Sequence, residues 1–528
     1  MLCIISCRPR APEIHSIYPK IGRMGETLTI TGENFGKTRD ESYITIGGAP
    51  PTGSSYISWQ NNLVSFTVPE FGEAGLVYVY VRGKRSNGVL FSNAASLPRP
   101  PAGDNQGLEP RIVSITPPAA PIGSLITIAG NNFGNSHGQS GVFFPWIAES
   151  LSPVPEGAMS EEFSAVSENE FGYESWNERE IRLRVPDGAV SGNIEVRTPR
   201  GNSVPFFFDV TGRPGTKAFR DKRSYAINYS VNVKTGEAES PNTLYLWVPR
   251  PAVTPAQRNV ELLSRSMEPF IENYRGTSLY KLNNLAANSD VQINLSYKID
   301  VHAIETSIRS QSIKAEEDSA FRLTYTQSAP LLPADDPGIK NQVNALLGRE
   351  RNPDIRARRI YDWLVNSGMI QGEVLEGGAL EALETKRADP YMAVLLYCTM
   401  LRAAGVPSLP VAGVLVSRNR QVIRHYWAEF WIDGLGWIPV DPVLGAGAVP
   451  PPFNIRGDRA SFYFGNLDNQ RIAFSRGIST LSPMDPRGRP VSHSRSYALQ
   501  NLWEEASGGI ESYSSLWGDI IISGVYVQ

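Results

Sequence analysis

An internal repeat constrains the fold of the N-terminal part of this sequence more strongly than any other feature. Segment 16–36 aligns without a gap to segment 114–134, and ten of the 21 aligned positions are identical. Repetition of this kind indicates one structural unit used twice. Within each copy, apolar and polar residues alternate as in a half-buried strand, for example over Thr27–Thr31, and a Gly-x-Asn-Phe-Gly turn follows. The sequence therefore predicts two β-sandwich domains, at residues 11–97 and 108–212.

The chain that follows the repeat is again rich in strand patterns. A linker of proline and glycine residues over Leu97–Gly103 separates the two copies, and a second break falls near Gly212–Gly215. Over Tyr225–Val233 the larger apolar side chains stand at every odd position, as expected for a strand with one buried face. We therefore expect a third sandwich at residues 218–310.

Helical signals dominate after this third sandwich. Two helices start with a capping Asp or Asn followed by proline, at Asp336-Pro337 and Asn352-Pro353. A third helix, Tyr391–Ala404, is apolar nearly all round, which predicts a buried central helix. Strands are expected at Leu409–Val416, His425–Ile432 and Trp437–Asp441. These elements predict an α+β domain at residues 320–450, with residues 451–528 as a C-terminal extension packed on it.

The composition limits the classes of function. The 50 basic and 53 acidic residues give a net charge of −3, which argues against a nucleic-acid-binding surface. The three cysteines (Cys3, Cys7 and Cys398) cannot form a disulfide framework, and the sequence has no metal-ligand spacing. No apolar run approaches the roughly 18 residues of a membrane span. We therefore expect no metal, no cofactor and no nucleic-acid partner, and membrane contact only through a lipid anchor.

The N-terminal residues 1–10 contain a candidate targeting motif. Ile4-Ile5-Ser6-Cys7 fits a bacterial lipoprotein box, with an aliphatic residue three positions before the cysteine and a small residue directly before it. The segment ahead of this box is shorter than the roughly 7–15 apolar residues of a secretory signal. Cys7 is therefore a candidate for lipidation, with an incidental cysteine as the alternative. The motif favours an extracytoplasmic protein, periplasmic or at the cell surface.

The order of elements in residues 320–450 indicates a catalytic layout. A buried helix is followed by a strand that starts at His425 and a strand that ends at Asp441. In thiol enzymes, a cysteine at the N-terminus of such a helix is activated by the histidine, which the acidic side chain orients.

The motifs around these residues resemble those of the bacterial transglutaminase-like superfamily, whose core is papain-like, and the N-terminal repeat resembles IPT/TIG domains. The first resemblance is carried by Thr385–Tyr391, Leu401–Pro407, His425–Phe430, Gly436–Pro442, Leu246–Pro251 and Phe464–Phe474. The implied fold is three all-β immunoglobulin-like sandwiches followed by an α+β transglutaminase-like (papain-like) core.

The resemblance implies which residues would carry the chemistry. The family pattern T-K-x-G-x-C reads Thr-Lys-Arg-Ala-Asp-Pro here, so Pro390 stands at the position of the nucleophilic cysteine. His425 and Asp441 stand at the positions of the catalytic histidine and aspartate. Proline has no nucleophilic atom, although Asp389-Pro390 is a good helix start. Cys398 lies about 12 Å further along the helix axis, and we expect it to be part of the core.

Three functions remain open at this point. In the leading hypothesis, the protein is a non-catalytic, transglutaminase-like pseudoenzyme of the cell envelope that binds or scaffolds a protein, peptide or glycan. In the second, it is an active hydrolase or protein-modifying enzyme that uses a non-cysteine group beside His425 and Asp441. In the third, it is a surface adhesin that works through its IPT/TIG-like domains.

The His425–Asp441 pair has three interpretations of its own. It is a satisfied contact that holds two strands together, part of a residual polar cleft that binds a ligand, or part of a site for a different reaction, such as metal- or water-mediated hydrolysis. The candidate lining residues of that cleft are Tyr391, Tyr426, Trp427 and Trp437.

Overall fold

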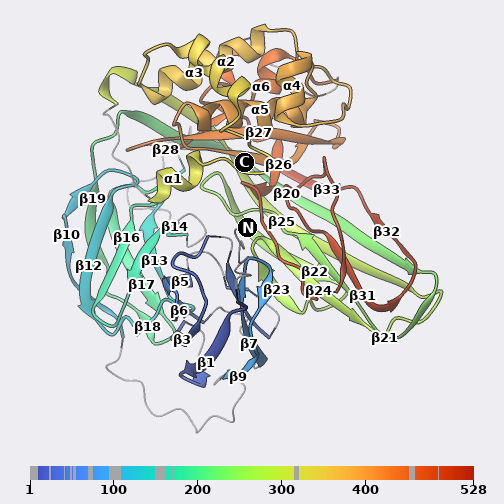
Figure 1. The fold of residues 1–528 in the computed structure, drawn as a ribbon. Helices are drawn as coiled ribbons and strands as arrows, with labels where there is room; N and C mark the ends of the chain where they lie inside the picture. Colours follow the sequence, from blue (N-terminus) through green and yellow to red (C-terminus); the bar gives the residue numbers. More distant parts are fainter. Residues whose placement is uncertain are drawn as a thin grey trace, which may run out of the picture.

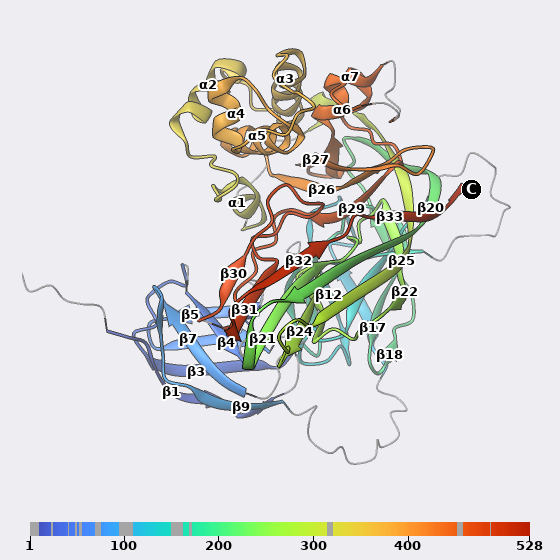
Figure 2. The same cartoon turned by 90° about the vertical axis from the view of Figure 1, so that its right-hand side faces the viewer.

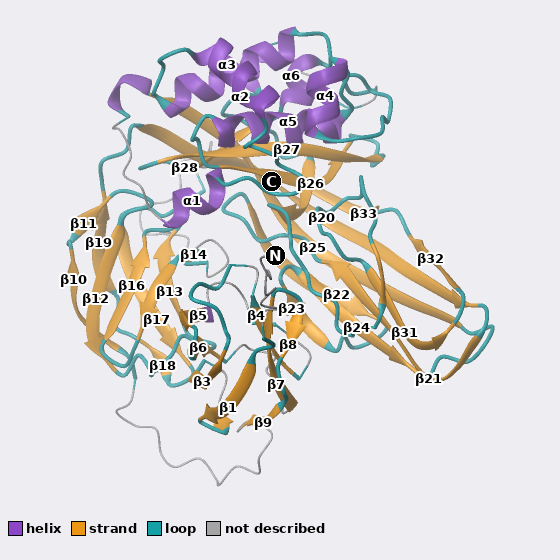
Figure 3. Cartoon of the chain, viewed as in Figure 1, coloured by secondary structure: helices purple, strands orange, loops and turns teal. Residues whose placement is uncertain are grey.

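Three β-sandwiches and a helical layer make up the computed structural model of this protein (Figure 1). The residues that it describes are 10–22, 25–40, 42–47, 50–51, 55–68, 75–93, 109–148, 162–167, 172–313, 320–450, 453, 458–485 and 487–527. Helices α2 to α6 gather at one end of the molecule, and strands form most of the rest (Figure 3). This architecture confirms the expected class of sandwiches followed by an α+β core.

The first two sandwiches each consist of two packed sheets. The first contains the sheets β1-β3-β6-β5 and β2-β9-β7-β4, and the second contains β10-β12-β16-β15 and β11-β19-β17-β13-β14, with β8 and β18 added at β7 and β17. The bounds in the first are β1 Glu13–Tyr18, β2 Ile21–Gly22, β3 Thr27–Glu33, β4 Tyr43–Ile46, β5 Tyr56–Gln60, β6 Leu63–Thr67, β7 Gly75–Val81, β8 Lys84–Arg85 and β9 Val89–Asn93. Those in the second are β10 Arg111–Thr116, β11 Ala119–Ala120, β12 Leu125–Asn131, β13 Gly141–Pro145, β14 Phe163–Ala165, β15 Tyr173–Trp176, β16 Glu180–Arg184, β17 Gly192–Thr198, β18 Gly201–Asn202 and β19 Phe206–Val210.

The two copies of the repeat share structural detail as well as sequence. The turn aromatics Phe35 and Phe133 are both buried in the cores of their sandwiches. In each copy a tryptophan indole N–H donates to the carbonyl of that phenylalanine, from Trp59 at 2.8 Å and from Trp176 at 3.0 Å. Both indoles are half-buried, and an N–H shielded from water without a partner would cost its desolvation energy. The repeat therefore encodes one sandwich design twice.

The third sandwich contains strands from two distant parts of the chain. Its sheets are β22-β25-β20-β32, with β33 also paired to β20, and β23-β24-β21-β31-β30. The bounds are β20 Gly215–Thr235, β21 Ala238–Pro249, β22 Gln257–Arg265, β23 Ile271–Tyr274, β24 Thr277–Asn283, β25 Asp290–Ile308, β30 Arg489–Val491, β31 Glu504–Ile510, β32 Tyr513–Trp517 and β33 Ile521–Val527.

Residues 451–528, expected as an extension packed on the α+β core, divide between two domains: residues 471–476 form a strand of the core sheet, whereas β31 to β33 join the third sandwich. Strands β32 and β33 pair antiparallel with β20, and β31 pairs with β21. The long β20 leaves its free edge open to both tail strands, and apolar tail residues such as Trp503 and Ile510 complete the core of the sandwich. Strand pairing across nearly 300 residues leaves no local mark in the sequence.

The α+β core is a four-stranded antiparallel sheet of order β28-β27-β26-β29 beneath a layer of helices (Figure 2). Its strands are β26 Ser408–Val416, β27 Val422–Ile432, β28 Gly436–Val440 and β29 Arg471–Arg476. Its helices are α1 Ala320–Thr326, α2 Pro337–Leu347, α3 Pro353–Asn366, α4 Ala379–Thr385, α5 Pro390–Ala403, α6 Pro442–Ala446 and α7 Arg459–Phe462. The predicted helix starts are confirmed, since the Asp336 carboxylate accepts from the Ile339 N–H at 3.0 Å and that of Asp389 from the Met392 N–H at 2.8 Å.

The two faces of this sheet pack against different parts of the molecule. Side chains of a strand alternate between faces, and in β27 the residues Ala428, Phe430 and Ile432 join the hydrophobic cluster of α5. On the opposite face, Trp431 and Trp437 join the cluster that continues into the second sandwich. A Cβ atom at Gly123 of that sandwich would lie 2.6 Å from the Trp431 ring, so the domains touch at van der Waals distance.

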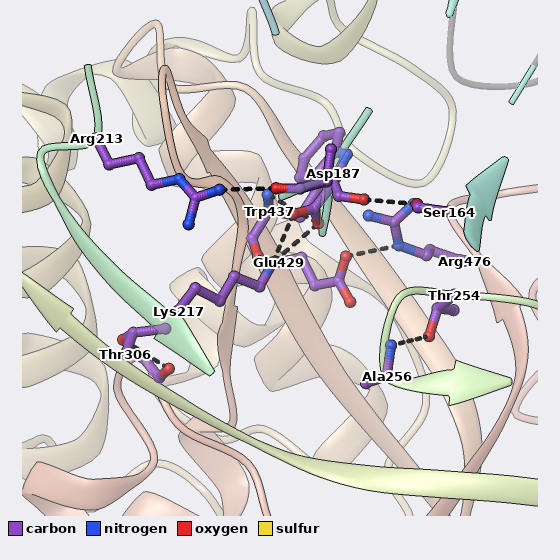
Figure 4. A network of polar contacts seen from close by, with 12 residues as sticks. Ser164, Asp187, Arg213, Lys217, Thr254, Ala256, Thr306, Glu429, Trp437 and Arg476 are labelled. Carbon is purple, nitrogen blue, oxygen red and sulfur yellow. Dashed lines mark hydrogen bonds and ion pairs between the residues drawn. The ribbon is translucent and has the colours of Figure 1, made fainter. Parts of the chain in front are cut away.

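A buried ion pair between Asp187 of the second sandwich and Lys217 of β20 lies against the edge strand β28 (Figure 4). Lys217 Nζ lies 2.8 Å from both Asp187 carboxylate oxygens and donates to the Trp437 carbonyl at 2.6 Å. Asp187 also accepts from the Trp437 N–H at 3.3 Å. Both charged side chains are under a tenth exposed. The network therefore satisfies the backbone N–H and carbonyl of Trp437 on the edge strand.

Gly436 tests this contact, because it allows Asp187 to approach. Its φ is +82°, and a Cβ atom there would collide with the Asp187 carboxylate. We expect Gly436→Ala to lower the melting temperature and to expose the 212–215 connection to limited proteolysis. The matched control is Gly276→Ala, whose φ of +86° carries similar strain with nothing within 4 Å. Equal effects of the two variants would show that backbone strain, and not the Asp187 contact, is responsible.

Candidate functional site

His425 and Asp441 lie in direct contact, as their positions on neighbouring strands predict. Strands β27 and β28 pair in regular antiparallel register from Ala428↔Val440 to Ile432↔Gly436. His425 Nε2 lies 2.7 Å from Asp441 Oδ2, and the two side chains are only 1% and 0% exposed. Because an ionised carboxylate can only accept, the imidazole Nε2–H donates this bond. The Nδ1 atom of His425 is buried and has no hydrogen-bond partner among the residues that the structure describes.

The Asp441 carboxylate accepts two further hydrogen bonds. Its Oδ1 caps α6 by accepting from the Leu444 N–H at 2.9 Å, and its Oδ2 accepts from Arg471 Nη1 at 2.9 Å. Burial alone would raise the pKa of Asp441, but the neighbouring His425 and Arg471 hold it below its usual value. The carboxylate is therefore ionised at neutral pH and bound on both oxygens.

Arg471 joins this carboxylate to a second one. Its Nη2 lies 3.2 Å from Asp468 Oδ2, which also accepts from the Tyr463 hydroxyl at 2.9 Å. Burial opposes ionisation of Asp468, yet Arg471 and the Gln470 N–H keep its pKa below the usual value. The guanidinium also lies over the Trp427 ring, 5.1 Å from its centre. A buried arginine between two carboxylates thus ties β29 to the end of β28.

The pair lies on the sheet face that points away from the central helix. Tyr426 belongs to the cluster around α5 and contacts the Tyr391 ring at 5.4 Å. His425 and Trp427, one residue before and after it, therefore face the other way. Their rings stack at 6.2 Å, and Trp427 belongs to the cluster on the side of the second sandwich.

The helix start at Pro390 has different neighbours. Arg495, from the C-terminal part of the chain, donates to the Asp389 carboxylate at 2.8 Å and lies 4.9 Å from the centre of the Tyr391 ring. The next residue, Ser496, accepts at its carbonyl from the Tyr426 hydroxyl at 2.9 Å. Arg495 thus binds the residues on both sides of Pro390. No hydrogen bond or ring contact in the described part of the chain joins Pro390 or Tyr391 to His425.

The four aromatic residues predicted to line a cleft are all in the protein interior. Their exposed fractions are 7% for Tyr391, 5% for Tyr426, 3% for Trp427 and 1% for Trp437. They also divide between the two faces of the sheet, as described above. In the described part of the chain these four residues form core contacts.

Cys398 is part of the core, as expected. It is fully buried within the cluster around α5, and burial raises the pKa of its thiol to about 12. A thiol with such a pKa is almost entirely protonated at neutral pH and reacts slowly. Cys7 lies outside the described residues.

The described residues hold no group of three or more His, Cys, Asp or Glu side chains placed to bind a metal ion. Among those residues, no helix is both long and apolar enough to cross a membrane.

Sequence reasoning missed Arg471 and Arg495, although both decide the surroundings of the predicted residues. The sequence contained a signal for Arg471. This charged residue begins strand 471–476, directly before the apolar residues Ile472–Phe474 and three residues after Asp468. Arg495 stands in a polar segment with no strand or helix pattern, so only the folded chain shows its contact with Asp389.

Comparison with known families identifies two types of domain in this chain. Residues 340–442, which include Pro390, His425 and Asp441, match the transglutaminase-like superfamily core. Residues 12–95 and 110–145 match the IPT/TIG domain. The chain carries a transglutaminase-like core behind N-terminal IPT/TIG domains.

Individual relatives are distant. An uncharacterized protein of Haemophilus influenzae is 24% identical over 262 residues, which cover 41% of this chain and 67% of that protein. A cyclomaltodextrin glucanotransferase of Paenibacillus macerans is 26% identical over 83 residues, which cover 16% of this chain and only 11% of that enzyme. Among solved structures, a "Putative Cysteine Protease" from Cytophaga hutchinsonii is 14% identical with a TM-score of 0.36 and covers 59% of this chain and 92% of its own.

The buried network makes a strong prediction for stability. Asp441→Ala leaves the Arg471 guanidinium buried beside a single carboxylate and removes the α6 cap, and breaking a buried pair costs about 3–5 kcal/mol. The control is Asp362→Ala, which removes the half-exposed Arg358–Asp362 pair on α3 and should cost about 0.3–0.5 kcal/mol. Calorimetry of both variants measures the difference. Similar small losses in the two would contradict a structural role for Asp441.

The lowered pKa values also predict how this contribution changes with pH. A carboxyl group whose pKa is lower in the folded state stabilises the fold fully at pH values above its pKa in the unfolded state, about 3.9. This contribution is lost as the pH falls through the pKa of the folded state. Because the pKa values of Asp441 and Asp468 are both lowered in the folded protein, this stability is lost below about pH 4. The melting-temperature difference between wild type and Asp441→Asn should therefore be constant near neutral pH and shrink in acid. A difference that grows in acid would contradict the assignment.

Proposed function

We propose that this protein is a non-catalytic member of the transglutaminase-like group that acts as a binding or scaffolding module at the bacterial cell envelope. The observation that carries the proposal is the buried His425–Asp441–Arg471 network in a core whose nucleophile position holds Pro390. Its ligand class is a protein, peptide or glycan.

The absent nucleophile is the first support. Thiol-dependent acyl transfer forms a covalent bond between substrate and a cysteine, and the proline ring offers no atom for that bond. The remaining thiol in the helix, that of Cys398, is fully buried with a raised pKa. Acyl transfer by the mechanism of thiol enzymes therefore has no group in α5 to carry it.

The surroundings of the histidine are the second support. A general base must reach the proton that it abstracts, but the His425 side chain is 1% exposed and lies on the sheet face covered by the second sandwich. Its Nε2–H is engaged by a carboxylate that Arg471 already neutralises. The same three side chains hold β27, β28 and β29 together, which accounts for them without chemistry.

An activity assay tests the proposal. The full chain should show no turnover of amide, peptide or peptidoglycan substrates, and His425→Ala and the control His15→Ala, an exposed residue of β1, should be equally silent. Turnover by wild type that disappears in His425→Ala alone would overturn the proposal and favour a hydrolase that uses another group.

A second variant separates the two supports. Pro390→Cys restores a thiol at the helix start, and we expect it to remain inactive because His425 points away from α5. Activity in this variant would show that only the nucleophile is missing from an otherwise competent site.

The envelope location rests on the motif at Ile4–Cys7, and Cys7 is proposed as a lipid attachment site. Mass spectrometry of the N-terminal peptide from the native host membrane fraction should show an acylated Cys7. The Cys7→Ser variant should leave that fraction. An unmodified Cys7 in a soluble, processed protein would refute the anchor.

A further inference from the structure

A cavity of about 330 Å³ lies at the seam between the transglutaminase-like sheet and the third sandwich. Pockets of about 300–1,000 Å³ at domain interfaces are the usual places for small ligands. Three separate parts of the chain build it: the β26–β27 hairpin, the segment after Arg495, and the start of β33. The residues that matter for recognition are Arg420, Arg424, Tyr497, Asp519, Ile520 and Ile522.

The base of this cavity is apolar and fixed. Val414, Tyr497, Ile520 and Ile522 are each at most 6% exposed, and all four belong to the hydrophobic cluster of the third sandwich. Burial raises the pKa of the Tyr497 phenol, so this ring stays neutral at physiological pH. The base therefore suits an aliphatic group and adds no charge of its own.

The rim of the cavity is cationic. It carries the guanidinium groups of Arg420 and Arg424 and one carboxylate, that of Asp519. Arg424 lies 3.7 Å from Asp519, and these side chains are 51% and 89% exposed, so their pairing is loose and worth little. Arg420 spends one N–H on the Ser523 carbonyl at 3.2 Å. Two guanidinium groups and a single exposed carboxylate leave a net positive charge at the opening of the cavity.

We propose that this seam pocket binds a carboxylate with an aliphatic body, either a free N-acylated amino acid or the C-terminal residue of a peptide. Arginine pairs with carboxylates through two parallel hydrogen bonds, which a loosely held Asp519 can yield to a better-placed ligand. The aliphatic part would rest on Ile520 and Ile522.

This site is separate from the His425–Asp441 pair. Arg424 directly precedes His425 in β27, so the two side chains lie on opposite faces of the sheet, and Arg424 shares its face with its cross-strand partner Val414. Binding at the seam pocket and turnover at the transglutaminase-like core are therefore independent, and each can fail alone.

Calorimetric titration of the full chain tests the proposal with four probes. These are N-acetyl-L-leucine, N-acetyl-L-leucinamide, and an apolar tripeptide with either a free or an amidated C-terminus. The free acids should bind at least about tenfold more tightly than the amides, because only they offer charge-assisted bonds to Arg424. Equal affinity of the two acids indicates a single-residue ligand, whereas tighter binding of the tripeptide indicates a peptide end.

Three variants complete the test. Arg424→Gln should weaken the free acids about tenfold, Asp519→Asn should strengthen them by removing the competing carboxylate, and Arg418→Gln, an exposed hairpin control outside the cavity, should change nothing. A folding defect would weaken binding in both variants, so opposite changes in affinity for Arg424→Gln and Asp519→Asn cannot result from misfolding. The proposal is overturned if wild type binds no probe, if amides bind as well as acids, or if Asp519→Asn weakens binding.

Discussion

The transglutaminase-like core depends on how the buried carboxylate of Asp441 is satisfied. An unpaired charge in the interior would cost several kcal/mol, so its partners must be supplied by the fold itself. The structure supplies them from three places: His425 on β27, Arg471 on β29 and the Leu444 N–H at the start of α6. Each partner fixes one element, and together they hold the end of the sheet in register.

In the proposed pseudoenzyme, the same network accounts for the presence of His425 and Asp441 without a nucleophile. If the histidine and aspartate served only catalysis, nothing in the fold would require them once a proline occupied the helix start. As members of a buried ion network they remain necessary for stability. The second and third sandwiches add to this role, because Asp187 of the second and Lys217 of β20 bind the Trp437 backbone at the other end of β28. Removal of the second sandwich would expose Trp431 and Trp437 on this face of the sheet.

The C-terminal part of the chain contributes to both ends of this arrangement. Strands β31 to β33 complete the third sandwich, and the segment between β30 and β31 carries Arg495 to Asp389 and Ser496 to Tyr426. Residues that follow the core in sequence thus cover the helix start where a nucleophile would stand. The seam pocket arises from the same crossing, since Tyr497 and the start of β33 form its walls.

Local sequence patterns predicted those features that depend on local interactions. The helix start at Asp389-Pro390, the repeat of the sandwiches and the contact of His425 with Asp441 follow from capping, periodicity and antiparallel neighbours. The pairing of β33 with β20, the salt bridge of Arg471 and the contact of Arg495 depend on residues that meet only in the folded chain. The face of β27 on which His425 lies could have been read from the alternation with the apolar Ala428 and Phe430, but only once the position of α5 was known.

The measurement that tests this account most directly is hydrogen–deuterium exchange at the imidazole Cε1–H of each histidine, followed by mass spectrometry. His15, which is exposed, provides an internal reference in the same sample. If His425 is a buried structural residue, its exchange should be far slower than that of His15 and should accelerate in Asp441→Ala. Exchange of His425 at the rate of His15 in the wild type would show that the pair opens to solvent, and would contradict the proposal that the pair serves the fold alone.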